Sequence, residues 1–307
     1  ERIKKIFKKK LLTKNISFLK GDLRDKLFLN QVFLEAKEEN NPFEGVIHFA
    51  GLKSVSESFL KPLLYWENNV YGSICLIETM RKFDCRNIVF SSSASIYGNT
   101  NSRAILETSE VKPFTPYGHT KVAIENILEA IFQSSKDSWG IANLRYFNPI
   151  GAHETGLIGE SPLNIPNNLF PIMCKVANGK KNKLQIFGND WPTNDGTCVR
   201  DYIHVMDLAD AHCSALEYLL ENKPQIINLN IGTGIGTSVL ELVKIFMKVT
   251  CCKLPYEFCA RRIGDSPYVV ANNTKASSIL NWSPKRDVDQ MCKDGWNWQK
   301  NNPNGFL

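Results

Sequence analysis

Short apolar runs that alternate with helical patterns constrain the fold of this chain more than any other feature. The runs are residues 15–19, 45–51, 87–90, 141–147 and 226–231. Three segments between them, residues 27–37, 69–83 and 117–134, carry apolar side chains at helical spacing. Apolar strands separated by helices predict an α/β protein with a doubly wound parallel sheet, covered by helices on both faces.

Small and polar residues stand where these runs end. They are Gly21-Asp22, Ala50-Gly51, Ser91 to Ser93, and Asn148. The carboxyl ends of parallel strands share one edge of a sheet, and ligands of such sheets bind at that edge. We therefore expect the functional site there.

The character of the sequence changes after Pro149. Gly, Pro and Asn become dense through Asn168, and the apolar runs are shorter and less regular. This change predicts a sheet domain over residues 1–149 and a smaller α+β substrate domain over 150–307. Residues from about 205 to 231 repeat the helix-then-strand pattern, so we expect them to return to the sheet domain.

Most of the net charge lies at the start of the chain. Its 37 Lys and Arg residues exceed its 31 Asp and Glu residues, which gives a formal charge of +6. Residues 1–20 hold eight basic residues and one acidic residue, so the rest of the chain carries −1. A body without a basic face argues against nucleic-acid binding. The basic segment lacks aromatic and Gly-rich interleaving, so we interpret it as a solvated helix.

The cysteines and histidines indicate a reduced, cytoplasmic protein without a metal site. The nine cysteines are scattered, odd in number and free of any Cys-x-x-Cys motif, and the five histidines form no cluster with zinc spacing. No secretory signal is visible, and no apolar run approaches the roughly 20 residues that a membrane span needs.

The strongest chemical constellation is Ser93 followed by Tyr117-x-x-x-Lys121. The four-residue spacing places phenol and ammonium on one helix face. An adjacent ammonium favours the phenolate and is expected to lower the tyrosine pKa, while a serine at a strand end can bind a substrate hydroxyl. The motif is weak by itself, because such a pair also occurs as a plain helix surface pair.

The sequence around these residues resembles a known family. Residues 90–98 (FSSSASIYG) and 116–121 (PYGHTK) resemble the extended short-chain dehydrogenase/reductase superfamily and, more narrowly, the UDP-glucose 4-epimerase family. Matching stretches continue in order: residues 47–53 (IHFAGLK), 145–149 (RYFNP), 165–169 (IPNNL), 186–190 (IFGND), 199–205 (VRDYIHV) and 261–265. The resemblance runs from about Asp22 to the C-terminus and implies a Rossmann-like sheet domain.

The resemblance implies an NAD-dependent isomerase of galactose metabolism that interconverts UDP-glucose and UDP-galactose through a 4-keto intermediate. Tyr117 would take the proton of the sugar 4-hydroxyl while C4 gives a hydride to NAD. Lys121 would hold the nicotinamide ribose and, with the cationic nicotinamide, keep Tyr117 acidic. Ser93 would bridge the substrate oxygen and Tyr117.

The family's binding residues transfer to matching positions. Besides the catalytic three, NAD would contact Asp22, Leu23, Phe49, Ala50, Gly51, Leu52, Lys53, Asn68 and Phe147. Besides Ser93 and Tyr117, the UDP-sugar would contact Asn148, Asn168, Leu169, Gln185, Phe187, Arg200, Arg262, Asp265 and Val269. Without the resemblance, Asn168 reads as a helix cap and Phe187 as a core aromatic.

Other residues are expected to be structural. His48 and His204 are interpreted as buried structural histidines with hydrogen-bond partners, and Asp207 as the N-cap of the following helix. Residues 232–236 (GTGIG) follow a strand and precede a helix, but the third glycine comes one residue early for a dinucleotide loop.

The sequence departs from the family at its start. Family members begin with a strand, a Gly-rich loop, a helix and a second strand, whereas this sequence starts inside the helix after them. In the order 3-2-1-4-5-6, residues 15–19 would be strand 3 and residues 45–50 strand 4. The first two strands and the Gly-rich loop would then be missing between them, leaving a gap of roughly 10 Å. We expect this chain to be a fragment of an active enzyme.

The finer function leaves alternatives open. Val269 occupies a position where the family often has Tyr, so we expect tolerance of UDP-N-acetyl sugars. A 4,6-dehydratase would need an acid pair where Ala94-Ser95 stands, and a UDP-glucuronate 4-epimerase would need a basic residue for the carboxylate. An inactive sugar-nucleotide-binding fragment is the non-enzymatic alternative. Family members are commonly homodimers, for which the helices near residues 69–83 and 122–134 are candidates.

Overall fold

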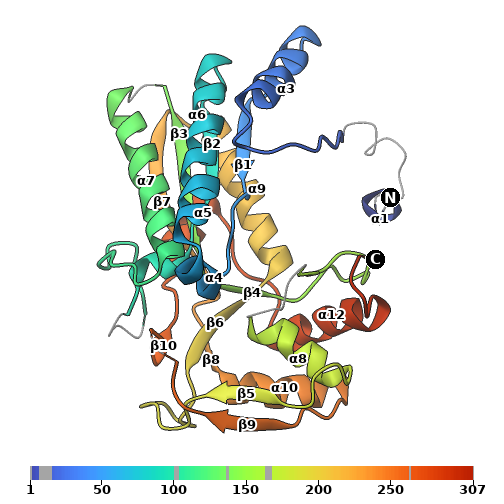
Figure 1. The fold of residues 1–307 in the computed structure, drawn as a ribbon. Coiled ribbons are helices and arrows are strands. Elements are labelled where there is room, and N and C mark those ends of the chain that lie inside the picture. Colours follow the sequence, from blue (N-terminus) through green and yellow to red (C-terminus); the bar gives the residue numbers. More distant parts are fainter. Residues whose placement is uncertain are drawn as a thin grey trace.

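The computed structural model describes residues 2–6, 16–99, 104–135, 138–162, 168–262 and 264–306. A layered sheet with helices on both sides forms the upper part of Figure 1. A second group of strands and helices from the C-terminal half lies below it. The short helix α1 (Arg2–Ile6) lies near the C-terminal end of the chain.

The main sheet consists of four parallel strands. These are β1 (Gly45–His48), β2 (Asn87–Ser91), β3 (Gly140–Tyr146) and β7 (Gln225–Ile231), in the order β1-β2-β3-β7. The register places His48 beside Phe90 and Ser91 beside Leu144, so the carboxyl ends align at one edge. The predicted runs 87–90, 141–147 and 226–231 therefore form strands, and 45–51 does so up to His48.

Alternation along the strands sends apolar side chains to both faces. Val89 packs with α9 (Val205–Glu221) and α11 (Thr274–Leu280), whereas Ile88 and Phe90 pack with α3 (Lys26–Glu38), α6 (Gly72–Lys82) and α7 (Pro116–Ser134). Figure 1 shows α6 and α7 on one side of the sheet and α9 on the other. The predicted doubly covered, Rossmann-like parallel sheet is confirmed. Its last strand, β7, follows α9 and pairs with β3.

The second group is built on smaller sheets. Strands β10 (Tyr268–Val269), β6 (Val199–His204) and β4 (Asn148–Ile150) are parallel, β8 (Gly236–Ser238) runs antiparallel to β6, and β5 (Leu184–Phe187) pairs with β9 (Tyr256–Cys259). Helices α8 (Leu169–Ala177), α10 (Val239–Thr250) and α12 (Val288–Asn301) complete it. Phe170, Leu242, Phe246 and Met291 are buried together there.

Local sequence signals explain where the helices near the site begin. Thr115 caps α7 by accepting a hydrogen bond from Gly118 N at 3.0 Å, and Pro116 takes the first helical position. Before α6 the chain forms α4 (Val55–Leu60), α5 (Pro62–Tyr65) and a π-helical turn over Trp66–Tyr71. A 3₁₀ turn spans Ala94–Tyr97 after β2.

Residues 16–19 form no strand, so that part of the predicted strand at 15–19 is wrong; Asn15 lies outside the described residues. A strand needs a hydrogen-bonded neighbour, and none of the described segments supplies one here. Its apolar side chains are exposed as a result, with Phe18 at 88%. Most of the expected solvated helix, residues 7–15, also lies outside the described residues.

The assignment of Asp207 as an N-cap is also wrong. His204 caps α9 by accepting from Met206 N at 3.0 Å, and Asp207 lies buried inside the first turn. Its carboxylate accepts from the backbone of Lys285 and Arg286 at 3.0 Å and pairs with the Arg286 side chain. Asp207 thus joins α9 to the segment before α12.

No described helix has the length and apolar character to cross a membrane. Within the same residues, no group of three or more His, Cys, Asp or Glu side chains is arranged to hold a metal ion.

Candidate active site

Ser93, Tyr117 and Lys121 meet at the carboxyl edge of the main sheet. Ser93 follows β2, and its Oγ accepts from Ser95 N at 3.2 Å, which caps the 3₁₀ turn. Tyr117 lies in the first turn of α7 and forms a hydrogen bond with Ser93. Lys121, one turn later, donates from Nζ to the carbonyl of Ser91 at 2.7 Å. The spacing predicted from the sequence thus becomes one compact cluster.

The pKa of Tyr117 differs from the sequence expectation. Burial penalises the phenolate and raises this pKa above its usual value, Tyr146 adds to the rise, and the hydrogen bond with Ser93 partly opposes it. The predicted lowering by Lys121 is not seen. Burial lowers the pKa of Lys121 itself to about 8, against the raising influence of Glu125.

Glu125 and Arg145 extend this cluster and were not singled out in the sequence. Glu125 follows Lys121 by four residues, so Tyr117, Lys121 and Glu125 share one buried face of α7. Its carboxylate pairs with Arg145 of β3 at 2.7 Å, with 8% or less of either side chain exposed. The spacing was the only available signal, because the sequence alone does not reveal the arginine across the sheet.

The predicted pyrophosphate segment, residues 49–53, forms the turn after β1. Phe49, Ala50 and Gly51 are exposed at the sheet edge, with the Phe49 ring 4.6 Å from that of His212. The backbone of Leu52 donates to Oδ1 of Asn69 at 2.7 Å. Gly51 has φ of 154°, and a Cβ there would lie 3.1 Å from the same Oδ1. The turn therefore needs glycine for its close approach to Asn69.

Asn69, the residue after the predicted cofactor contact Asn68, lies against this turn. Asn68 donates to the carbonyl of Leu64 at 2.9 Å, within its own helical segment. Asn69 is buried and donates to Leu52 O at 3.0 Å and to Thr120 Oγ1 at 3.2 Å. It therefore joins the turn after β1 to α7, between Tyr117 and Lys121.

The predicted adenine contacts, Asp22 and Leu23, lie in the segment just before α3. Asp22 is exposed and pairs with Arg24 at 2.7 Å, and Arg24 also pairs with Glu67 at 2.7 Å. The hydrogen bonds from Arg24 lower the pKa of Asp22 to about 2. Leu23 is half-buried against the core of α3 and α6. Lys53, the last residue of the pyrophosphate turn, reaches Glu160 at 3.0 Å.

The predicted nicotinamide contact, Phe147, is a core residue in this structure. It is 6% exposed and packs with Ile96, Tyr97 and Ala271. Its neighbour Tyr146, at the end of β3, is half-buried and lies close enough to influence the pKa of Tyr117. Tyr146 packs on the α9 side of the sheet, with its ring centre 6.2 Å from that of His212, whereas Phe147 packs in a cluster that includes Val122 of α7.

Most predicted substrate residues gather in the second group of strands. Arg200 of β6 is paired in register with Val269 of β10. Asp265 pairs with Arg200 at 3.5 Å and with Arg262 at 3.2 Å, and the Arg262 guanidinium lies 4.6 Å from the centre of the Phe187 ring. Two guanidinium groups, a carboxylate and an aromatic ring thus lie together. The guanidinium groups can donate to phosphates and the carboxylate can accept from ribose hydroxyls, so the group suits a nucleoside diphosphate.

The remaining substrate candidates lie at the borders of this cluster. Gln185 is exposed on β5, two residues before Phe187. Asn148 is exposed on β4, which begins directly after β3 and pairs with β6. Asn168 occupies the N-cap position of α8, but its side chain makes no capping bond, and Leu169 packs into the core. The Asn168 amide is therefore not engaged as a cap.

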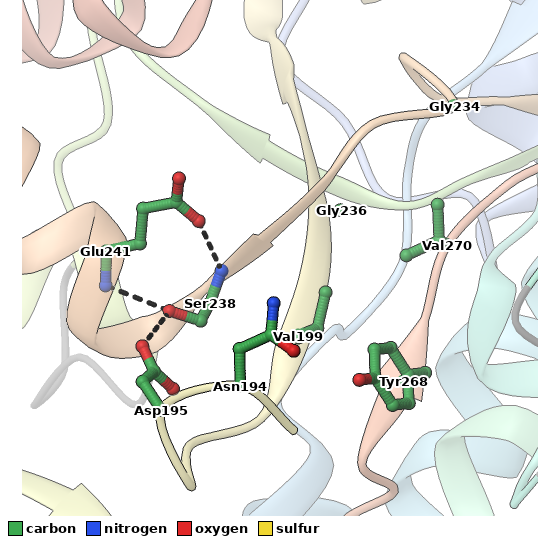
Figure 2. A pocket seen from close by; sticks show the side chains of 9 residues that line it. All are labelled: Asn194, Asp195, Val199, Gly234, Gly236, Ser238, Glu241, Tyr268 and Val270. Atoms are coloured by element: carbon green, nitrogen blue, oxygen red, sulfur yellow. Dashed lines mark hydrogen bonds between the residues drawn. The ribbon is translucent and has the colours of Figure 1, made fainter.

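A cavity of about 520 Å³ lies apart from these candidates (Figure 2). Val199 and Tyr268 line it, whereas Arg200 and Val269, next in the same strands, point to the opposite face. Its carboxylates serve the fold: Asp195 accepts from Ser238, and Glu241 completes a capping box with Ser238. Gly234 of the 232–236 loop also lines it, and Asp201 accepts from Gly234 N at 2.9 Å.

His48 and His204 are buried and hydrogen-bonded, as the structural interpretation requires. His48 Nε2 lies 2.8 Å from Ser73 Oγ, and burial lowers its pKa to about 3. His204 Nε2 lies 3.2 Å from Asp294. Sequence reasoning did not single out His212, whose Nε2 lies 2.8 Å from Ser91 Oγ.

Comparisons with known proteins agree with this geometry. The family model described as GDP-mannose 4,6 dehydratase matches residues 1–295. The UDP-glucose 4-epimerase 2 of Arabidopsis thaliana is 48% identical over 97% of this chain and 84% of its own length. The UDP-glucose 4-epimerase of Bacillus subtilis is 47% identical over 97% of this chain and 86% of its own.

A solved structure shows the same fold. The UDP-glucose 4-epimerase of Bifidobacterium longum, in complex with NAD+ and UDP, superposes with a TM-score of 0.91 and 41% identity, covering 99% of this chain and 88% of that one. The chain belongs to the UDP-glucose 4-epimerase family, within the NAD-dependent epimerase/dehydratase superfamily.

Proposed function

We propose that this chain carries the NAD-dependent interconversion of UDP-glucose and UDP-galactose. The observation that carries the proposal is the buried cluster of Ser93, Tyr117 and Lys121, combined with Arg200 of β6 and the Asp265 and Arg262 side chains beside it. The first group has the chemistry of proton transfer to and from a hydroxyl. The second has the chemistry of a diphosphate and ribose site.

The residues at the sheet edge fit NAD. Lys121 has three N–H donors, of which one goes to Ser91 O, so it can also donate to the hydroxyls of a ribose. Gly51, which approaches Asn69 closely, presents no side chain in the turn after β1, where a pyrophosphate would pass. When bound, NAD supplies a hydride acceptor that later returns the hydride.

Proton movement then falls to the protein. The sugar 4-hydroxyl would give its proton to the phenolate oxygen of Tyr117, as C4 loses a hydride and becomes a ketone. Ser93 would donate a hydrogen bond to that oxygen. After the 4-keto sugar turns over and is reduced again, Tyr117 would return the proton to the oxygen on C4. Burial raises the Tyr117 pKa, so the positive charges of the bound state are needed to form the phenolate.

The residues after Ser93 favour epimerisation over dehydration. Elimination of water from C5 and C6 needs an acid and a base near the sugar. Ala94 and Ser95 occupy the places where the dehydratases carry their acidic pair, and the Ser95 Oγ is buried. The same site thus lacks the proton donor that a 4,6-dehydratase uses.

The test is conversion of UDP-glucose to UDP-galactose by the purified protein with added NAD, followed by chromatography of the products. Tyr117→Phe should reduce the rate by a factor on the order of 10² to 10⁴. Tyr218→Phe is the matched control, because Tyr218 lies on α9 and bonds Gln225 at 3.3 Å. Equal rates for the Tyr117 variant and the wild type would refute the assignment.

We also propose a homodimer formed through α6 and α7. A cavity of about 230 Å³ between these helices is lined by Ile74, Ile77, Ile127 and Ile131. Glu78 and Arg81 also line it, and a second copy would cover this surface. Light scattering should give twice the monomer mass, and Ile127→Glu should give the monomer.

The nine free cysteines support a reducing, cytoplasmic location.

A further inference from the structure

A buried ion pair adjoins Lys121, and the mechanism above does not use it. Glu125 of α7 is 7% exposed and Arg145 of β3 is 5% exposed. Nε of Arg145 donates to Oε1 of Glu125 at 3.1 Å, and Nη2 donates to Oε2 at 2.7 Å. This two-point geometry fixes the orientation of both side chains more firmly than a single contact would.

The carboxylate of Glu125 also holds the end of β2. Ser92 Oγ donates to Glu125 Oε1 at 2.5 Å. Ser92 stands between Ser91, whose carbonyl accepts from Lys121, and Ser93, which bonds Tyr117. Glu125 therefore holds Ser92 in place, and the residues on either side of Ser92 bond Lys121 and Tyr117.

The other side of Arg145 holds the turn that Ser93 caps. Nη1 of Arg145 donates at 3.0 Å to the hydroxyl of Tyr97, the last residue of the 3₁₀ turn, and at 3.0 Å to Glu107 O. The Tyr97 hydroxyl donates in turn to Asn230 of β7 at 2.7 Å. Through Arg145, the turn after Ser93 is joined to β3 and β7.

We propose that Glu125 and Arg145 are positioning residues for the reaction, and that Glu125 supplies the carboxylate that balances the ammonium of Lys121. The catalytic meaning of this inference rests on the proposed function. The contacts themselves do not, so the electrostatic part can be tested without turnover.

Among the groups around Lys121, Glu125 supplies the negative charge that balances the ammonium. The titratable and charged groups near it are His48 of β1, Arg145 and Tyr146 of β3, Tyr117 and Glu125 of α7, and His212 of α9, which bonds Ser91. Burial lowers the pKa of His48 to about 3 and that of His212 to about 4, so both are neutral near pH 7. Glu125 is the one carboxylate among these groups.

The experiment follows the pKa of Lys121 by NMR of protein labelled at lysine Cε, with the signal assigned by its loss in Lys121→Arg. Glu125→Gln removes the negative charge and leaves the Arg145 cation, so the Lys121 pKa should fall by about one unit. Arg145→Met leaves the carboxylate facing the ammonium alone, so the Lys121 pKa should rise by a similar amount. Shifts in the same direction, or no shift in either variant, would overturn the proposal.

Further variants separate this role from plain folding support. Each single change leaves a buried charge, whereas the double variant Glu125→Gln/Arg145→Met removes both charges and should destabilise the fold less. Its Lys121 pKa should lie between those of the single variants. Ser92→Ala should lower kcat about tenfold with KM unchanged, whereas unchanged kcat would contradict the positioning role.

The matched control lies in another part of the molecule. Asp294→Asn alters a buried carboxylate that pairs with His204 at 3.2 Å. It should lower stability without moving the Lys121 pKa. A Lys121 shift in this control as large as that in Glu125→Gln would show a general effect of destabilisation and overturn the inference. If the wild-type protein shows no epimerase activity, the proposed function is refuted, but the NMR result still stands.

Discussion

The two halves of the candidate site are built in opposite ways. At the edge of the main sheet, Tyr117, Lys121 and Glu125 are each 7% exposed or less. In the segment between β9 and β10, the Arg262 side chain is 55% exposed and pairs with Asp265, which is 21% exposed. Buried groups keep a fixed geometry and shifted pKa values, while exposed pairs can exchange partners with a ligand. The first half is thus suited to chemistry and the second to binding.

The largest expected effect tests the buried half. Burial lowers the pKa of Lys121 from 10.5 to about 8, so between these values the unfolded chain binds a proton that the folded chain has released. Stability must then rise with pH through this window, by about 3 kcal/mol from Lys121 alone. Lys121→Met should remove this gain, as measured by urea unfolding at pH 7.5 and 10.5. Parallel pH profiles of the two proteins would contradict the buried-ammonium description.

The next prediction tests the binding half. Arg200 donates to Ser266 O at 2.7 Å and pairs with Asp265, so its planar group is already oriented. Arg200→Lys should weaken UDP binding by about 2 kcal/mol, because an ammonium does not reproduce bidentate contacts with a phosphate. Calorimetric titration with UDP measures this change.

Arg261→Lys is the matched control for that variant. Arg261 bonds Asp190 at 2.8 Å and lies 4.1 Å from the centre of the Trp191 ring, away from Asp265. Its substitution should leave UDP affinity nearly unchanged. Equal losses in both variants would show that neither arginine acts as a specific phosphate contact.

A third prediction concerns sugar selectivity in the same half. Val269 is half-buried on β10, beside Arg200. A Tyr ring there would occupy the space open to a 2-N-acetyl group. Val269→Tyr should therefore lower kcat/KM for UDP-N-acetylglucosamine relative to UDP-glucose about tenfold, near 1.4 kcal/mol. An unchanged ratio would refute the gate.

The sequence was most informative where structure depends on near neighbours. The runs at 87–90 and 117–134 became β2 and α7 with little change, because periodicity and caps are local. Residues 16–19 of the run predicted at 15–19 form no strand, because a strand also needs a partner from elsewhere in the chain. Asp207 failed for a related reason: its charge is used by residues 285 and 286, far along the sequence.

The site shows the same division. Tyr117 and Lys121 were found from a four-residue spacing, and Glu125 lies one turn farther on the same face. Asn68 and Asn69 both lie in the π-helical turn over Trp66–Tyr71, and Asn69 is the one of the two that bonds the turn after β1, while the cofactor contact of Asn68 stays a prediction. The raised Tyr117 pKa and the Arg145 contact depend on burial and on packing between strands, which residue spacing does not encode.

The smallest expected effect lies where the two parts of the molecule touch. Lys53 and Glu160 form an ion pair at 3.0 Å, with the lysine side chain 69% exposed, so the pair contributes less than about 1 kcal/mol. If Lys53 binds the pyrophosphate, Lys53→Ala should weaken NAD binding about threefold, and Glu160→Gln should strengthen it about twofold by releasing the lysine. Both changes should fade in 1 M salt. Weaker binding in both variants would mean that the pair orders the site instead of competing with the cofactor.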